Sequence, residues 1–136
     1  MRIPAALARQ VWQRAAGCCE YCRIAQEWDD VPFEIDHIIA RKHDGPTALS
    51  NLALCCFHDN SHKGSNIAGR DPKTRKLTPL FNPRRQQWSW HFRWQGAYLI
   101  GRTPVGRATV AVLNINDSFR VELREGLIEE GPFPPA

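Results

Sequence analysis

A helical period of hydrophobic residues opens the chain. Ile3, Leu7 and Val11 recur at the spacing of one helix face, and Pro4 suits a first helical turn. Gly17 is of the residue type that commonly follows the end of a helix. The pattern therefore predicts an amphipathic N-terminal helix that ends near residue 17.

The hydrophobic period changes from helical to alternating in the next segment. Residues 33–38 alternate as a strand does, and the sequence HDGP at 43–46 is a strong turn signal. Leucines between residues 49 and 54 indicate a second short strand, which leads towards a helix over 56–65. The segment is therefore predicted to form a strand–strand–helix (ββα) unit.

The C-terminal half shows a third pattern, which predicts a β-hairpin and two helices. Residues 69–83 are rich in proline and basic side chains and are predicted to form a loop. Aromatic residues then occupy alternate positions of 88–94, which predicts a strand paired with residues 97–100. Core packing is the favoured role of these rings over base stacking, because stacking needs exposed rings. Thr103 and Asp117 are predicted to cap the two helices.

Composition is that of a soluble globular protein. Of the 136 residues, 43% are hydrophobic and 24% are charged. This length fits one α+β domain over 1–136, with a core over residues 17–68 and an extension over 69–136. No hydrophobic run approaches the roughly 20 residues of a membrane-spanning helix, and the N-terminus lacks the apolar stretch of a signal peptide. We therefore expect a cytoplasmic protein without a membrane partner.

Positive charge gathers in one part of the extension. The chain has a net charge of +4 and a pI near 9.0. Between residues 70 and 85 the only acid is Asp71, and the basic residues are Arg70, Lys73, Arg75, Lys76, Arg84 and Arg85. Such a stretch suits a polyanion, because each phosphate contact releases condensed counterions, and we assign Arg84 and Arg85 to nucleic-acid contacts. From charge alone, a solvated loop is the favoured alternative.

Residues 36–63 hold side chains suited to phosphodiester hydrolysis, which needs a water, a base and positive charge. His37 is a candidate base, because an imidazole with a pKa of about 6.5 accepts a proton at neutral pH. Asp36 and Asn60 offer the hard oxygen ligands that Mg²⁺ or Mn²⁺ prefers. Asp36 and His37 point to opposite faces of a regular strand, so they serve one pocket only if the backbone bends there. Lys63, on the same expected helix face as Asn60, is a candidate phosphate contact.

Two strings in this segment, EIDHIIARKHDG and LSNLALCCFHDNSHKG, have the residues and the spacing of the HNH signature. From Cys19 to Asn66 the chain resembles the HNH endonucleases, also called His-Me finger or ββα-metal nucleases. The resemblance implies a ββα-metal nuclease core and a nucleic-acid partner, DNA, whose cleavage leaves a 5′-phosphate and a 3′-hydroxyl. The extension is similar to one in a group of small bacterial HNH proteins.

The resemblance also implies a role for each motif residue. His37 would be the general base, and Asp36 and Asn60 would bind the catalytic Mg²⁺ or Mn²⁺. Asn51 would hold the loop backbone and orient His37 without touching the substrate. His62 lies outside the three motif positions, and a phosphate contact is its expected secondary role.

Many HNH proteins hold a structural zinc ion with two C-x-x-C knuckles, and this chain departs from that pattern. Cys19 and Cys22 supply the first knuckle, but the second begins at Cys56 and has Asp59 in the place of its last cysteine. A carboxylate binds zinc at about 2.0–2.2 Å and a thiolate at about 2.3 Å, so a site of three cysteines and Asp59 is feasible. It would be a weaker site than four thiolates.

Alternatives for the cysteines stay open. His58 could replace Asp59 as the fourth ligand, and Cys18 and Cys55 could be spare ligands. Clustered cysteines in a reducing cytosol more often bind metal than form disulfides, and the odd number of cysteines argues against a complete disulfide framework. Reduced core thiols without metal are the remaining possibility.

Two other functions compete with an active endonuclease. A non-cleaving nucleic-acid-binding module on an HNH scaffold would not need Asp36, His37 and Asn60 together, and all three are present. A structural zinc protein that binds protein partners would have no salt-dependent affinity for DNA, whereas phosphate contacts require one. We therefore predict a metal-dependent DNA endonuclease.

Overall fold

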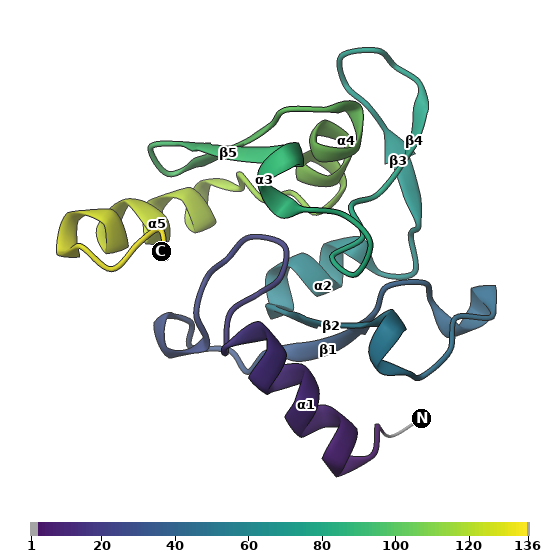
Figure 1. Ribbon diagram of the computed structural model, residues 1–136. Helices are drawn as coiled ribbons and strands as arrows, with labels where there is room; N and C mark the ends of the chain where they lie inside the picture. Colours follow the sequence, from purple (N-terminus) through teal and green to yellow (C-terminus); the bar gives the residue numbers. More distant parts are fainter. Residues whose placement is uncertain (1–2, 136) are drawn as a thin grey trace.

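The computed structural model describes residues 3–135, which form an α+β architecture of helices and small antiparallel sheets. In Figure 1 the chain up to α2 occupies one half of the molecule, and the extension lies against it as the other half. One cluster of buried hydrophobic side chains draws members from both halves, from Val11 to Phe133. Within residues 3–135, no helix is long and apolar enough to cross a membrane.

The predicted N-terminal helix is confirmed as α1, Ala5–Ala15. It ends where Ala16 adopts a left-handed conformation with φ 53° and Gly17 follows with φ 71°. Val11 is its buried residue, and the helix packs against β2. Arg14 stabilises this contact, because its guanidinium donates a hydrogen bond to the carbonyl of Leu52 over 2.6 Å.

The predicted strand–strand–helix order is observed between residues 34 and 63. β1 (Glu34–His37) pairs antiparallel with β2 (Leu52–Cys55), and every residue of β2 is buried. α2 (Phe57–Lys63) follows at once, with the Sγ of Cys56 accepting from the amide of Asp59 over 3.3 Å at its first turn. α2 packs against β1, so these three elements bring the side chains of a strand and a helix together.

The loop predicted over residues 69–83 is wrong, because it contains a second hairpin. β3 (Ala68–Arg70) pairs antiparallel with β4 (Leu77–Pro79). Gly69 lies so close to α4 that an added Cβ would be 2.3 Å from Val112. Packing against α4 stabilises these two strands. Their proline and basic residues are typical of a loop, so the sequence alone does not indicate them.

The aromatic strand predicted over residues 88–94 is wrong in its first half. Trp88–His91 form a helical turn, α3, and only Phe92–Gln95 continue as β5, paired with β6 (Tyr98–Gly101). The helical turn places the rings of Trp88 and Phe92 5.3 Å apart, four residues along the chain. Core packing is therefore the role of these two rings, and the alternation in sequence does not reflect a single strand.

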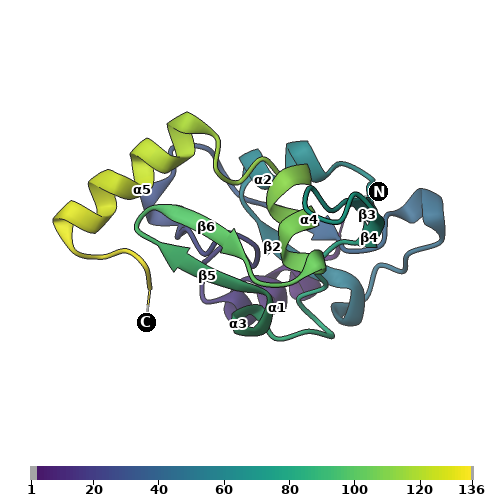
Figure 2. The ribbon, with the colours of Figure 1, turned by 90° about the horizontal axis from the view of Figure 1, so that it is seen from above.

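Both C-terminal helices are confirmed. Thr103 caps α4 (Pro104–Val112) by accepting from the amide of Gly106, and Asp117 caps α5 (Ser118–Glu130) by accepting from the amide of Phe119. Figure 2 shows the β5–β6 hairpin between α5 on one side and α4 on the other. The extension thus contains two hairpins and the three helices α3–α5, where one hairpin and two helices were predicted.

Polar contacts join the extension to the earlier half at the turn that carries the first two knuckle cysteines. The indole Nε1 of Trp88 donates to the carbonyl of Tyr21 over 2.7 Å. Arg84 forms an ion pair with Glu20, whose other carboxylate oxygen accepts from the amide of Leu54 over 2.9 Å. The extension therefore braces the segment that precedes β1.

Candidate functional site

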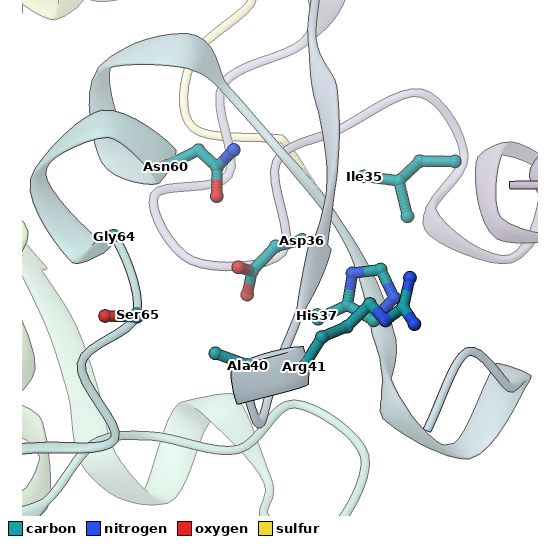
Figure 3. A pocket seen from close by; sticks show the side chains of 8 residues that line it. All are labelled: Ile35, Asp36, His37, Ala40, Arg41, Asn60, Gly64 and Ser65. Atoms are coloured by element: carbon teal, nitrogen blue, oxygen red, sulfur yellow. The ribbon is translucent and has the colours of Figure 1, made fainter. Parts of the chain in front are cut away.

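A hollow of about 250 Å³ lies between β1, the loop that follows it and the C-terminal end of α2. Three of the residues predicted from the sequence line it together: Asp36, His37 and Asn60. Figure 3 shows the carboxylate of Asp36 directed towards Asn60, with the ring of His37 across the strand beside Arg41. The hollow therefore combines a carboxylate, an amide and an imidazole.

Asp36 is held by two neighbours inside the protein. The side chain is only 4% exposed. Its Oδ2 accepts from the hydroxyl of Tyr21 over 2.9 Å, and its carboxylate forms an ion pair with Lys63 at 3.1 Å. Burial raises the pKa of Asp36, while the ammonium of Lys63 and the Tyr21 hydroxyl favour the charged form and oppose that shift. These contacts fix the orientation of the carboxylate.

The phosphate contact predicted for Lys63 is wrong, because the structure places this side chain in the interior. Lys63 is 1% exposed, so its ammonium does not reach the surface where a phosphate would lie. Instead it donates to Asp36 and to the carbonyls of His37 at 3.3 Å and Ile38 at 3.1 Å. A buried ammonium needs such partners, and here they tie the end of α2 to the end of β1.

His37 is half-buried and lines the hollow. Its Nε2 lies 2.9 Å from the hydroxyl of Thr47. Burial lowers the pKa of His37 below its ordinary value of 6.5, and the positive charges of Arg41 and Lys63 lower it further. A lowered pKa keeps the ring neutral at pH 7, which is the form that accepts a proton.

Asn51 holds the loop that follows β1, as its predicted role requires. The side chain is buried; its Oδ1 accepts from the amide of Ile39, and its Nδ2 donates to the carbonyls of Ile39 and Pro46, each over 2.9 Å. Gly45 packs so tightly in the same loop that an added Cβ would be 2.9 Å from the Asn51 amide. One buried amide thus joins both ends of the loop that begins beside His37.

Asn60 is oriented by a residue that the sequence did not single out. Its Nδ2 donates to Oε1 of Glu34 over 2.8 Å, which leaves the amide oxygen directed towards Asp36 in Figure 3. Glu34 lies two positions before Asp36 on β1, and such residues share one face of a strand. That spacing was a signal by which Glu34 could have been found.

Tyr21 and Arg41 are two further site residues that the sequence did not reveal. Tyr21 lies between knuckle cysteines, and Arg41 begins a short 3₁₀ helix, Arg41–His43, after β1. No periodicity in the sequence relates either residue to the hollow, so only the fold shows that they contact it or border it.

The remaining predicted nucleic-acid residues lie outside this hollow. His62 is exposed on α2, but it lines a different hollow with Phe119, and its Nδ1 lies 2.8 Å from the carbonyl of His58. Arg84 is 14% exposed and forms an ion pair with Glu20. The phosphate contact predicted for Arg84 is therefore wrong, and the residue makes a contact within the protein instead. Arg85 is exposed.

A second set of side chains has the composition of a metal centre. The ligand atoms of Cys19, Cys22, Cys56 and Asp59 all lie within 4.8 Å of one another, and all four residues are buried. The Sγ atoms of Cys22 and Cys56 are 3.8 Å apart, as in a tetrahedral zinc site, where bonds of about 2.3 Å put two sulfurs roughly 3.8 Å apart. Burial raises the pKa of Asp59 well above its ordinary value, a cost that a bound cation would offset. The cluster could therefore hold a metal ion.

Comparison with known protein families agrees with this geometry. The family model described as HNH endonuclease matches residues 19–66, which include the hollow's Asp36, His37 and Asn60, as well as Asn51 and the four-residue cluster. The match covers this segment and does not include the extension. Neither the comparison with curated proteins nor the comparison with solved structures gave a match. The match to the HNH family model indicates a nuclease-type or nucleic-acid-related function.

The Asn51 contacts in the HNH segment give a first prediction. Asn51→Ala should lower the free energy of unfolding by about 2–4 kcal/mol, because the three hydrogen bonds of this side chain, at roughly 1 kcal/mol each, are lost and two carbonyls lose a partner. Urea denaturation measures this change. Hydrogen exchange of the Ile39 amide, which donates to Asn51 Oδ1, should also accelerate more than that of β2 amides.

Asn66→Ala is the matched control, because Asn66 is exposed. Its effect should stay within about 0.5 kcal/mol. Equal effects of the two substitutions, with no selective change at Ile39, would contradict the assignment of Asn51 as the brace of this loop.

Proposed function

We propose that the protein is a metal-dependent endonuclease that hydrolyses phosphodiester bonds of DNA. The observation that carries this proposal is the shared hollow of Asp36, His37 and Asn60 inside the segment that matches the HNH family. In this proposal β1, β2 and α2 form the ββα-metal core, and the extension completes a single domain over 1–136.

The donor set suits a hard divalent cation, Mg²⁺ or Mn²⁺. Asp36 and Asn60 contribute oxygen atoms, which these ions prefer, and the open hollow leaves room for retained waters. A carboxylate has about four lone-pair directions. Within residues 3–135, Oδ1 of Asp36 accepts a hydrogen bond only from Lys63, so it keeps capacity for a cation. When bound, the ion would stabilise negative charge on the scissile phosphate.

His37 supplies the base. Its neutral ring would take a proton from the attacking water, and its contact with Thr47 limits rotation of the ring. Arg41 lines the same hollow and is exposed, so its guanidinium can meet a phosphate oxygen. The cation that contacts phosphate near the base is therefore proposed to be Arg41, in place of the buried Lys63.

Plasmid nicking tests the proposal. With Mg²⁺ or Mn²⁺ the protein should nick supercoiled DNA, and His37→Ala should reduce the rate by about 10²–10⁴-fold, the usual contribution of a general base. Asp36→Ala and Asn60→Ala should raise the concentration of metal needed for half-maximal rate. His43→Ala is the matched control, because His43 is exposed and does not line the hollow; its rate should stay near that of the parent.

Two outcomes would contradict the endonuclease. Equal nicking by the parent and His37→Ala would show that a contaminant cuts the plasmid. Salt-dependent binding of DNA without any metal-dependent nicking would instead favour the non-cleaving binding module.

The pKa of His37 predicts a pH dependence. Because only the neutral ring accepts a proton, kcat/KM should fall as pH decreases through that pKa, and the acid midpoint should lie below 6.5. Arg41→Gln should move this midpoint upwards, since a positive charge that lowers the pKa is removed, whereas Arg41→Lys should leave it nearly unchanged. A midpoint above 6.5 in the parent would contradict His37 as the base.

We also propose that Cys19, Cys22, Cys56 and Asp59 hold a structural zinc ion. Thiolates and a carboxylate are its common ligands, and the buried cluster has no open position for substrate. The ion would join the first knuckle to α2, which carries Asn60, and would not take part in hydrolysis.

Metal analysis tests this site. Protein purified without chelator should contain about one equivalent of zinc and should unfold at lower temperature after chelation. Cys22→Ser should lose most of the zinc, whereas Cys18→Ser should keep it, because Cys18 lies outside the cluster. Zinc below about a tenth of an equivalent in the parent would reject the proposal and leave reduced core thiols.

A further inference from the structure

We infer that the β3–β4 hairpin is an arm that binds duplex DNA beside the scissile phosphate. The inference rests on the proposed function for its substrate, and it assigns to the extension a contact that the HNH segment does not contain. The arm is defined here as residues 68–79, with the loop 71–76 at its tip. In Figure 1 this loop projects beyond the rest of the extension.

The two faces of the arm differ. Gly69 and Thr78 form one cross-strand pair; Gly69 lies against Val112 of α4, and Thr78 is buried. The neighbouring pair, Arg70 and Leu77, must point the other way because side chains alternate along a strand. Leu77 is 81% exposed, so this outer face is open to solvent.

Charge at the tip is positive and its only acid is neutralised. The guanidinium of Arg107, on α4, donates two hydrogen bonds to the carboxylate of Asp71, over 2.9 and 3.0 Å. Asp71 is fully buried. Lys73, Arg75 and Lys76 are all exposed around it. The tip therefore presents cations to solvent without an opposing surface carboxylate from its own loop.

The same aspartate makes the tip rigid. Asp71 Oδ1 accepts from the amide of Lys73 over 3.0 Å, and Oδ2 accepts from the hydroxyl of Thr74 over 2.8 Å. The carbonyl of Asp71 accepts from the amide of Arg75 over 2.7 Å. Because the loop is already ordered, binding a polyanion would cost little conformational entropy. A solvated loop of surplus charge would not need such bracing.

The arm adjoins the candidate active site. Ser65, which follows the end of α2, lines the hollow of Asp36 and His37. Ile67 lines a neighbouring hollow together with Ile39, from the loop after β1, and Pro79 of β4. Figures 1 and 2 both show the hairpin beside that loop. A duplex whose phosphate occupies the first hollow could therefore extend along the outer face of the arm.

Duplex DNA is the partner that these features fit. A two-stranded β-ribbon can enter the major groove, and exposed Lys and Arg at its tip can meet the phosphates on either side. The tip offers charge, and neither the tip nor the neighbouring Leu77 supplies an aromatic ring for single-strand stacking. The expected contact is therefore independent of base sequence.

Salt-dependent binding tests the inference. In a His37→Ala background, which prevents cutting, affinity for a 30-base-pair duplex is measured by fluorescence anisotropy at several salt concentrations. The triple substitution Lys73→Gln, Arg75→Gln and Lys76→Gln should reduce the slope of log K against log salt by roughly 2 to 3, because each phosphate contact contributes about 0.9. Lys73→Arg with Lys76→Arg should keep the parental slope.

A control of equal charge removes three exposed arginines elsewhere: Arg9 of α1, Arg93 of β5 and Arg102 after β6. Their replacement by Gln should change the slope by less than one. Equal slopes for the arm variant and this control would overturn the inference, as would a loss confined to single-stranded DNA. Circular dichroism and thermal unfolding of each variant show that the slope reports binding by folded protein.

The two proposals fail in different ways. If the parent with His37 intact nicks plasmid and the arm variant binds and nicks like the control, only the arm is rejected. If the parent binds duplex through the arm but does not nick it with any divalent ion, the arm stands and the endonuclease is rejected. A parent that does not bind duplex at low salt rejects the arm directly.

Discussion

The buried ammonium of Lys63 is the interaction on which the candidate site depends. It joins the last residue of α2 to the carboxylate of Asp36 and to two carbonyls at the end of β1. Because breaking a buried ion pair leaves an uncompensated charge, helix and strand are strongly constrained to this relative position. Asn60 lies one turn earlier on the same helix, so the constraint that satisfies Lys63 also aims the amide of Asn60 at the hollow.

The extension also stabilises the position of the Asp36 carboxylate. Trp88 donates to the carbonyl of Tyr21, and the hydroxyl of Tyr21 in turn donates to Asp36. The ring of Phe81 packs edge-on against Tyr21 at 6.4 Å. Tyr21, which lies between two knuckle cysteines, thus connects the aromatic cluster of the extension with the carboxylate of Asp36. The cysteine cluster holds both ends of one short turn, at Cys19 and Cys22, and the extension holds the residues between them. These contacts explain how so small a strand–strand–helix unit is held in place.

The sequence predicted the local chemistry better than the tertiary contacts. Helix starts at Pro4, Thr103 and Asp117 were predictable because caps and prolines act within a few residues. The strands at 68–79 were missed because their stability comes from packing against α4, which is distant in sequence. Similarly, the motif identified Asp36 and Asn60, but no local pattern shows that Lys63 is buried between helix and strand. Burial and long-range ion pairs are properties of the assembled fold.

The central claim is that Asp36 and Asn60 hold one cation in the hollow that His37 also lines. Anomalous diffraction from a crystal soaked in Mn²⁺ tests it most directly. A manganese peak should appear in the hollow, within bonding distance of a carboxylate oxygen of Asp36 and of the amide oxygen of Asn60, with His37 facing a bound water. Manganese bound only elsewhere, with this hollow empty at saturating concentration and Lys63 as the sole cation at Asp36, would contradict the account.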